Sequence, residues 1–334
     1  VAGRHGLLDA GDVRGEIDNV VRRAHDRLRA DIHQRFAAQI RVEEGMERAR
    51  RDEAVALYEA FLGRYQDDPR WTPDVVYRLA ELYFERSNDE YLRAVAAYDA
   101  EMARFEAQKT SVIPNQPQQG YDPSIQLYLR LVRQFPDYRL LDGALYLLGY
   151  CLGEQGMEDA ARRSWLALVC ANRYQPPVDL EERRDERRLP LAARGAGPFV
   201  DPYEGCEPRH AASRFNAEAW TRIGEHHFDH NDIEVAIAAY RRVLVDRDGP
   251  YYDKALYKLA WSYYRADRFV EASQGFDELV LFADRRQRET GKFGSDLRAE
   301  AIQYLAVCFA EDDWDADGAP DVQTGVERIE KFYE

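Results

Sequence analysis

A pair of small residues 12 positions apart recurs three times in this chain, each time within the same pattern of apolar residues. A large apolar residue stands four positions before the first small residue, and an aromatic residue stands four positions after the second. Spacings of three and four residues mark one face of a helix. The pattern therefore predicts a repeated unit of two helices that cross where the small residues lie. The three pairs are Gly149 and Ala161, Gly224 and Ala236, and Ala260 and Ala272.

The segment from Lys254 to Leu279 shows this unit most completely. Its two predicted helices are separated only by Ala266, Asp267 and Arg268. So short a connection makes successive helices antiparallel neighbours. The expected buried faces consist of Leu256, Leu259, Ala260 and Tyr263 in the first helix and Ala272, Phe276 and Leu279 in the second.

The pattern of the first helix occurs at five places along the chain. Trp220 and Leu256 are 36 residues apart, whereas Leu145 and Trp220 are 75 apart and Leu256 and Ile302 are 46 apart. The longer intervals indicate insertions between units. The five patterns are Val76-Leu79-Ala80-Tyr83, Leu145-Leu148-Gly149-Leu152, Trp220-Ile223-Gly224-His227, Leu256-Leu259-Ala260-Tyr263 and Ile302-Leu305-Ala306-Phe309.

These units resemble the tetratricopeptide repeat, a helix–turn–helix unit of about 34 residues. The resemblance covers most of the chain from about Ala49 onward. It implies an all-α, tetratricopeptide-like helical-repeat solenoid with a right-handed superhelix, in which each unit buries its apolar face against its neighbours. Tyr146 near the small Gly149, and Phe135-Pro136 at the end of a second helix, make the repeats most similar to those of bacterial cell-envelope lipoproteins. Those proteins serve outer-membrane assembly, division or gliding.

The chain divides into four predicted segments. We expect the first to form a long helix that caps the array. A coiled-coil contact with a partner is the alternative, although apolar spacings of mostly four residues do not hold a strict heptad. The interruptions of the repeats are interpreted as surface insertions, with a partner-binding or groove-covering role as the alternative. The segments are 1–48, the N-terminal helix; 49–175, repeats with a loop insertion near 108–121; 176–214, an irregular insertion; and 215–334, repeats with an Asp-rich loop at 312–322.

Two helix pairs are expected before the loop insertion. Residues 52–65 are predicted to be the second helix of a degenerate unit, because Gly45 lies where its first helix needs a good helix former. Residues 73–86 are predicted to form the next first helix, with Pro73 tolerated in its first turn. Residues 91–107 are the expected partner of that helix.

The charge of the chain limits the class of its partner. The formal net charge is −15, and a nucleic-acid-binding protein would show a basic face. The sequence therefore favours a protein or peptide partner, cationic if charged, over DNA, RNA or anionic lipid. No apolar run approaches the roughly 20 residues that span a bilayer. Because the chain starts at Val1 and ends inside a predicted helix at Glu334, we expect it to be a piece of a longer protein.

Four cysteines are present. Cys151 and Cys308 fall within predicted helices and resemble small buried apolar residues. Cys170 ends a predicted second helix and Cys206 lies in the following insertion, so a disulfide between them would pin that insertion. Such a bond requires an oxidising compartment. Free thiols are the alternative, since the sequence alone does not set the geometry.

Residues 313–321 form an acidic stretch that resembles the start of a calcium loop of the EF-hand or thrombospondin type. Calcium prefers six to eight oxygen ligands, and Gly318 would permit the sharp turn between them. The twelfth loop position, where an EF-hand has a bidentate Glu, holds Thr324, and Glu327 comes three residues later. We predict a structural Ca²⁺ site, with an acidic insertion without metal as the alternative. The predicted ligands are Asp313, Asp315, Asp317 and Asp321.

Two histidines form a second constellation. His226 and His230 are four residues apart on one predicted helix face, a spacing that can hold zinc. The sequence indicates no third ligand, and His227 falls on a core position of the repeat. Two ligands do not close a zinc site, so no zinc is predicted here.

No sequence motif indicates catalysis. The chain has no glycine-rich phosphate loop, no Gly-x-Ser-x-Gly turn and no Cys/His nucleophile motif. The resemblance instead implies a non-enzymatic scaffold that binds a protein or peptide through the concave face of the array. The candidate partner-binding residues lie on first helices beside the core positions, and packing between repeats is the alternative role for each. They are Tyr77, Tyr146, Arg222, Tyr257 and Lys258.

The expected location is the bacterial cell envelope, in the periplasm or associated with the outer membrane. This expectation rests on the lipoprotein-like repeats, the candidate disulfide and the calcium-like loop, since weak calcium sites fill more readily outside the cytoplasm. A cytoplasmic repeat adaptor and a regulatory repeat domain of a larger enzyme are the alternatives.

Overall fold

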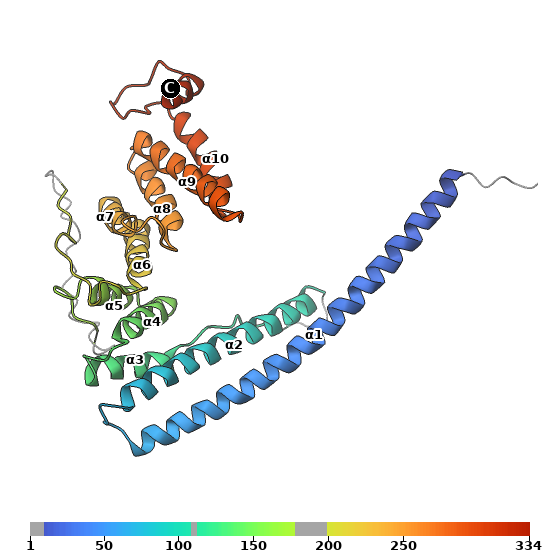
Figure 1. Ribbon diagram of the computed structural model, residues 1–334, viewed down its shortest axis with the longest axis vertical. Helices are drawn as coiled ribbons and strands as arrows, with labels where there is room; N and C mark the ends of the chain where they lie inside the picture. The colour runs from blue at the N-terminus through green and yellow to red at the C-terminus, as the bar shows by residue number, and fades with distance from the viewer. Residues whose placement is uncertain (1–9, 108–111, 178–198) are drawn as a thin grey trace, which may run out of the picture. The chain divides into compact units, whose positions relative to one another are not determined.

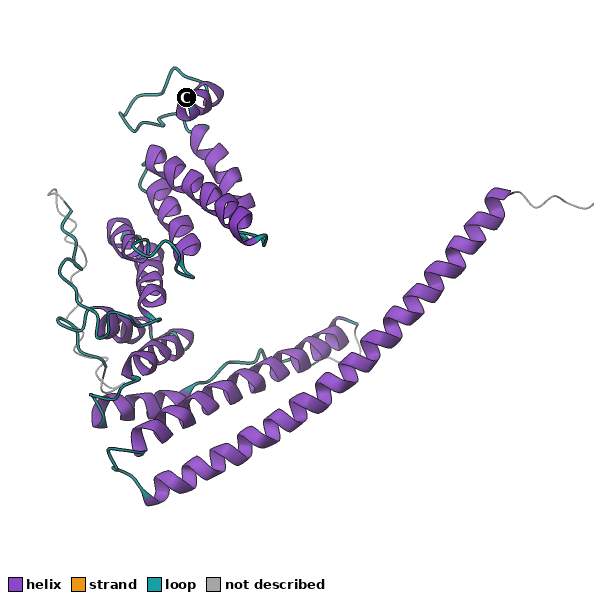
Figure 2. Cartoon of the chain, viewed as in Figure 1, coloured by secondary structure: helices purple, strands orange, loops and turns teal. Residues whose placement is uncertain are grey.

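The computed structural model describes residues 10–107, 112–177 and 199–334. Over these ranges the chain forms eleven helices and no strand (Figure 1; Figure 2). It divides into two compact units, one ending at Arg64 and one beginning at Tyr65. The predicted insertions at 108–121 and 176–214 lie partly outside the described residues.

The first unit contains a single helix of 55 residues, α1 (Ala10–Arg64). The helix runs through Gly45 and through the expected break before Asp52, so the prediction of a separate helix from residue 52 is wrong. The backbone of Gly45 does not adopt the left-handed conformation that ends helices. A glycine inside a helix costs only about 1 kcal/mol relative to alanine, and Met46, Glu47 and Arg48 next to it are good helix formers.

The second unit is a linear array in which every helix packs against the one before it (Figure 1). Nearest-neighbour packing of this kind is typical of helical repeat proteins, because each pair completes its core only with the next. The helices are α2 (Thr72–Glu106), α3 (Asp122–Gln134), α4 (Leu141–Glu154), α5 (Glu158–Val169), α6 (Asn216–Asp229), α7 (Ile233–Val243), α8 (Tyr252–Arg265), α9 (Phe269–Thr290), α10 (Arg298–Phe309) and α11 (Gly325–Tyr333).

The turns after α4, α6 and α8 share one backbone conformation. The second residue after each helix has a positive φ, 71° at Gly156, 61° at Asn231 and 57° at Asp267. Gly, Asn and Asp are the residues that tolerate this left-handed conformation. The following N–H then donates to the carbonyl five residues back, as Arg268 does to Tyr263 at 2.9 Å. This bond satisfies a carbonyl that the helix end would leave unpaired.

The corresponding position after the first pattern is Ser87, and there the helix does not end. Residues 73–86 and 91–107 are therefore not two paired helices, as predicted, but parts of the single helix α2. Serine lacks the tolerance for a left-handed backbone that Gly156, Asn231 and Asp267 provide. The second helix that packs on α2 is instead α3.

The small residues of the repeat lie where paired helices approach most closely. A methyl group on Gly149 would stand 2.4 Å from Nε1 of Trp165, and one on Gly224 would stand 2.5 Å from Cε1 of Tyr240. In the α8–α9 pair the first helix carries Ala260 instead, and the room comes from Gly275, where a methyl group would stand 2.9 Å from the Ala260 Cβ. The expected crossing at these positions is confirmed.

The last first helix, α10, is only partly covered. Leu305 and Phe309 are buried as expected, but Ile302 is 43% exposed and Ala306 is exposed as well. After Gly149, Gly224 and Ala260 the residue 12 positions later is a buried alanine of the second helix. Here that residue is Gly318, which lies in the Asp-rich loop, and α11 starts only at Gly325. The predicted fully buried stripe of this helix is therefore wrong at two positions.

Candidate functional site

The first helices α4, α6, α8 and α10 contact one another through side chains that link successive units. We call these contacting side chains the first-helix row. Tyr146 on α4 forms a hydrogen bond with Glu218 on α6, and the Lys258 ammonium on α8 lies 3.6 Å from Oε1 of Glu225 on α6. Tyr257 on α8 donates to Oε2 of Glu300 on α10 at 2.9 Å. The row contains most of the residues that the sequence proposed for partner binding.

Tyr77, on α2, is a packing residue. Its side chain is buried against the rings of Tyr128 and Tyr138, with centroid distances of 6.3 and 5.9 Å. Its hydroxyl occupies the space beside Gly143, where a methyl group would stand 2.6 Å away. The structure therefore favours the packing role that the sequence left open for Tyr77, and it removes this residue from the exposed candidates.

Tyr146 occupies the equivalent position on α4 and is also buried. Its ring stacks on Phe215 at a centroid distance of 5.0 Å. Burial, together with the hydrogen bond to Glu218, raises the pKa of the phenol. Tyr146 thus joins two repeats through its ring and its hydroxyl.

Arg222 and Lys258 are half-buried and share one acidic partner. Glu225 accepts from Nη1 of Arg222 at 3.3 Å and lies 3.6 Å from the Lys258 ammonium. Arg222 also lies 4.0 Å from Glu218. The two predicted cations are therefore neutralised by carboxylates on the same row, so they do not form a free basic patch.

Tyr257 belongs to a partly buried aromatic group at the edge of the core that the sequence prediction missed. Its ring is 6.4 Å from Trp261 and 6.3 Å from Tyr304, and Trp261 and Tyr304 pack edge-on at 4.4 Å. We call Tyr257, Trp261 and Tyr304 the aromatic cluster. Trp261 stands five positions after Leu256, and Tyr150 and Glu225 occupy the same position in their own units. Periodicity therefore places Trp261 beside the core. Its neighbour Tyr304 comes from another repeat, which periodicity within one unit does not show.

Carboxylates surround this aromatic cluster. Glu300 accepts the Tyr257 hydroxyl, and Glu311 accepts the hydroxyl of Tyr264. Burial, with the hydrogen bond to Glu300, raises the pKa of Tyr257 to about 12. The hydrogen bond to Glu311, with burial, raises the pKa of Tyr264 to about 12. Both phenols therefore stay neutral at physiological pH and donate to these carboxylates.

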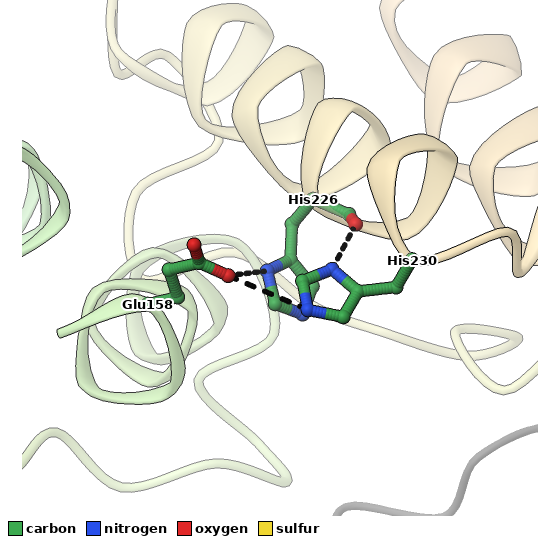
Figure 3. Close-up of side chains that lie close together, drawn as sticks. All are labelled: Glu158, His226 and His230. Carbon is green, nitrogen blue, oxygen red and sulfur yellow. Dashed lines mark hydrogen bonds and ion pairs between the residues drawn. The ribbon is translucent and has the colours of Figure 1, made fainter. Parts of the chain in front are cut away.

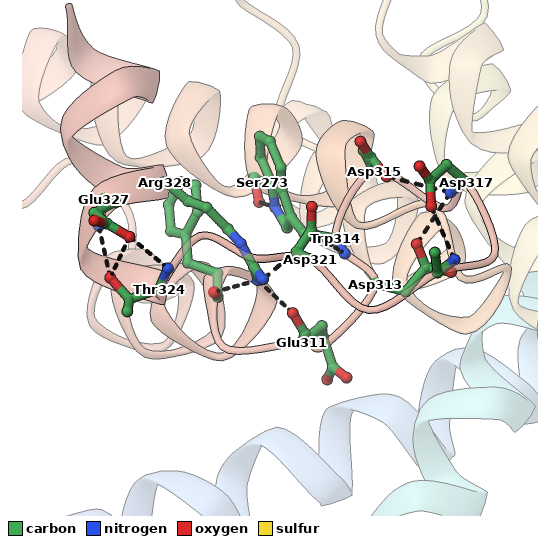
Figure 4. Close-up of polar contacts among 12 residues, drawn as sticks. Ser273, Glu311, Asp313, Trp314, Asp315, Asp317, Asp321, Thr324, Glu327 and Arg328 are labelled. Atoms are coloured by element: carbon green, nitrogen blue, oxygen red, sulfur yellow. Dashed lines mark hydrogen bonds and ion pairs between the residues drawn. The ribbon is translucent and has the colours of Figure 1, made fainter.

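The Asp-rich loop between α10 and α11 gathers three of its four predicted ligands (Figure 4). Carboxylate oxygens of Asp313, Asp315 and Asp317 lie within 4.8 Å of one another. Asp313 also accepts backbone N–H groups of Asp317 at 3.0 Å and Gly318 at 3.1 Å. Backbone turns thus account for the grouping without a metal, and the calcium site stays a prediction.

Asp321 has a different set of contacts from the other three (Figure 4). Its carboxylate accepts the backbone N–H of Trp314 at 2.8 Å and lies 3.3 Å from the buried Arg328 guanidinium. Glu327, the late acidic residue, forms a capping box with Thr324 at the start of α11. These two carboxylates therefore brace the loop against α11.

The predicted cysteine pair is joined by a disulfide between Cys170 and Cys206, with a Cα–Cα distance of 4.5 Å. The bond holds residues 199–210 against the end of α5. Asn172 adds two hydrogen bonds, donating to the carbonyl of Gly205 and accepting from the N–H of Glu207. Tyr203 in this segment is buried, and its hydroxyl lies 2.6 Å from Nε2 of His227.

His227 is a core residue of α6, as its repeat position predicts. It is buried between Tyr203 and Asp232, whose carboxylate is 3.5 Å from its Nδ1. Burial, followed by repulsion from Arg162, lowers its pKa to about 3. His226, in the last turn of α6, and His230, which directly follows the helix, lie together with ring centroids 4.2 Å apart.

This architecture, a stack of paired helices over the described residues, defines an all-α helical repeat protein. Residues 254–281, which cover most of α8 and the first part of α9, match the family described as the tetratricopeptide repeat. Repeats of this family generally mediate protein–protein interaction. No curated protein sequence matches the chain. Among the described helices, none combines the length and the apolar character that crossing a membrane requires.

Proposed function

We propose that this chain is a non-enzymatic scaffold of the bacterial cell envelope that binds a basic peptide segment of a protein partner through its first-helix row. The aromatic cluster carries this proposal. Half-exposed Tyr and Trp side chains are typical anchors of protein interfaces, because they bury a large area and keep a polar edge for hydrogen bonding.

The carboxylates around the cluster determine the chemistry of the partner. Glu300 on α10 accepts the Tyr257 hydroxyl, and Glu311, just after the end of α10, accepts the Tyr264 hydroxyl. Their charge, added to the net charge of −15 of the chain, favours lysine or arginine side chains on the partner. A segment with an apolar anchor between basic residues fits these features.

The experiment that tests this function is a selection of peptides from a random library by the purified chain, followed by measurement of the dissociation constant. We expect basic peptides, and we expect Trp261→Ala to weaken their binding at least ~10-fold, which corresponds to about 1.4 kcal/mol. Leu281→Ala is the matched control, because Leu281 is an exposed apolar residue on α9. Acidic peptides, or equal binding by the Trp261 variant, would contradict the proposal.

The envelope location is supported by the disulfide and by the resemblance of the repeats to those of envelope lipoproteins. Disulfides form and persist in oxidising compartments such as the periplasm and are rare in the cytosol. Differential alkylation of the protein in intact cells measures the state of Cys170 and Cys206. We expect both to be oxidised, whereas two reduced thiols would favour the cytoplasmic adaptor or a regulatory domain of a larger enzyme.

A further inference from the structure

Three potential metal ligands converge where α5 meets α6 (Figure 3). Glu158 is the first residue of α5, His226 lies in the last turn of α6, and His230 directly follows that helix, one turn further on. The Glu158 carboxylate oxygen Oε2 lies 3.4 Å from Nε2 of His230 and 3.8 Å from Nδ1 of His226. The sequence prediction found only the two histidines, because Glu158 belongs to a different repeat.

The orientation of the His230 ring is fixed by a backbone group. Its Nδ1 lies 2.8 Å from the carbonyl oxygen of His226, which can only accept, so Nδ1 donates the proton (Figure 3). In a neutral ring Nε2 then carries a lone pair, and this lone pair faces the Glu158 carboxylate. Two acceptors that face each other need a cation between them, either a proton or a metal ion. A second-shell contact from Nδ1 to a backbone carbonyl is also usual for histidines that bind metals.

The spacing of the ligand atoms fits a zinc ion. Zinc bonds of about 2.0–2.2 Å place neighbouring ligand atoms of a tetrahedron roughly 3.3 Å apart. The separation between His230 and Glu158 is already 3.4 Å. The distance between His226 and Glu158 needs to shorten by less than 1 Å. The Glu158 side chain can move by this amount, because it is 59% exposed in the first turn of its helix.

A cavity of about 240 Å³ adjoins the three ligands. Besides Glu158, its lining contains Glu154, Glu225 and Asp229, with Arg222 as its one basic side chain among the described residues. Arg222 is paired with Glu225 at 3.3 Å. The lining therefore holds more carboxylates than cationic side chains, which favours a cation, and the cavity leaves room for a water molecule or a further ligand. Arg162, whose charge also acts on His226, is paired with Asp159 at 2.9 Å.

We propose that Glu158, His226 and His230 bind one Zn²⁺ ion, with a fourth coordination position open to this cavity. Two histidines and one carboxylate with an open position are an established ligand set for zinc. The ion connects α5 of one helix pair to α6 of the next. It therefore clamps two neighbouring repeats, a role that is independent of partner binding at the aromatic cluster.

Isothermal titration of the full chain, purified without a histidine tag and freed of metal with a chelator, tests the proposal with ZnCl₂. We expect one Zn²⁺ per chain and a higher melting temperature in its presence. The variants are His230→Gln and Glu158→Gln, whose side chains are exposed enough to preserve the fold. Each is expected to weaken zinc binding roughly 10–100-fold and to abolish the thermal shift.

Two controls distinguish this site from zinc held elsewhere. His210→Gln changes an exposed histidine outside the cluster, and Asp315→Asn changes the Asp-rich loop. Both are expected to bind zinc as the unmodified chain does. Equal zinc affinity in the unmodified chain, His230→Gln and Glu158→Gln would overturn the proposal, and so would loss of zinc binding in Asp315→Asn. His226→Ala is not used, because the His226 side chain is largely buried and its loss affects packing.

Discussion

The close helix crossing at Gly224 makes a direct prediction about stability. The ring of Tyr240 occupies the space that a Cβ at position 224 would need. We expect Gly224→Ala to lower the free energy of unfolding by about 1–3 kcal/mol, because overpacking forces side chains or backbone to shift. Urea unfolding followed by circular dichroism measures the change.

Gly153→Ala is the matched control, since a methyl group at Gly153 would make only ordinary contacts with Trp165 and Ala161 at 3.7 and 3.8 Å. Alanine is favoured over glycine in a helix by up to ~1 kcal/mol. The control is therefore expected to be neutral or stabilising. A Gly224→Ala variant as stable as the control would contradict this prediction. It would show that the two helices can move apart enough for a methyl group without loss of free energy of unfolding.

The two cysteines outside the disulfide give a chemical prediction. Cys151 and Cys308 are buried. Burial raises the pKa of both thiols, that of Cys308 to about 12, so almost no thiolate is present at neutral pH. We expect a thiol reagent to label no cysteine in the folded protein, two after denaturation and four after denaturation with reduction. Fast labelling of the folded chain would contradict this burial.

At the level of the helical elements, the ends of helices are predictable where a turn residue tolerates the left-handed backbone. Asp267 and Gly156 mark turns because these residue types tolerate the left-handed backbone, and the pairs around them were predicted correctly. Ser87 carries no such signal, so α2 runs on where apolar periodicity alone predicts a pair. The exposure of Ile302 was not predictable either, since it depends on a second helix displaced by the Asp-rich loop.

The candidate site was predictable only in part, for a related reason. Periodicity within one repeat identifies the residues beside the core, such as Tyr77 and Tyr257. It does not show that Tyr77 is buried beside Gly143 of α4, or that Tyr257 contacts Tyr304 of α10. Contacts between repeats depend on pairs of residues far apart in the sequence.

The turn between α8 and α9 tests this account of helix ends. Asp267 has a φ of 57°, a conformation that costs residues with a Cβ roughly 1–2 kcal/mol and glycine much less. We expect Asp267→Ala to destabilise the protein by about 1 kcal/mol and Asp267→Gly to be neutral or stabilising. Urea unfolding of the two variants side by side provides the measurement, and the opposite order of stability would refute the role of the turn.

The Asp-rich loop gives a metal prediction at the same scale. If Asp313, Asp315 and Asp317 hold Ca²⁺, calorimetric titration of the chain with CaCl₂ gives binding heat that vanishes in both Asp315→Ala and Asp317→Ala. Asp321→Asn, which changes a carboxylate already engaged by Arg328, is expected to retain binding at least in part. Absence of heat and of thermal stabilisation in excess Ca²⁺ would leave the loop as an acidic insertion closed by its own backbone turns.

At the scale of the whole repeat array, stability is a sum of nearest-neighbour contacts, so the weakest junction limits cooperativity. The junction between α5 and α6 is interrupted by the long insertion, and the segment 199–210 covers it from the side. The disulfide from Cys170 to Cys206, with a sequence separation of 36, ties this segment to α5. The segment is also linked to the next pair of helices. Tyr203 forms a hydrogen bond with His227 on α6, and Asp201 accepts one from Arg242 on α7.

Reduction of this disulfide is therefore expected to weaken the array at its centre. Closing a loop of this length lowers the entropy of the unfolded chain by an amount worth about 4 kcal/mol. We expect a reducing agent to lower the urea midpoint and to open residues 199–210 to proteolysis before the helices unfold. The Cys170→Ala, Cys206→Ala double variant should behave like the reduced protein and should not respond to the agent. An unchanged midpoint in the double variant would mean that Tyr203 and the hydrogen bonds of Asn172 hold the segment without the covalent link.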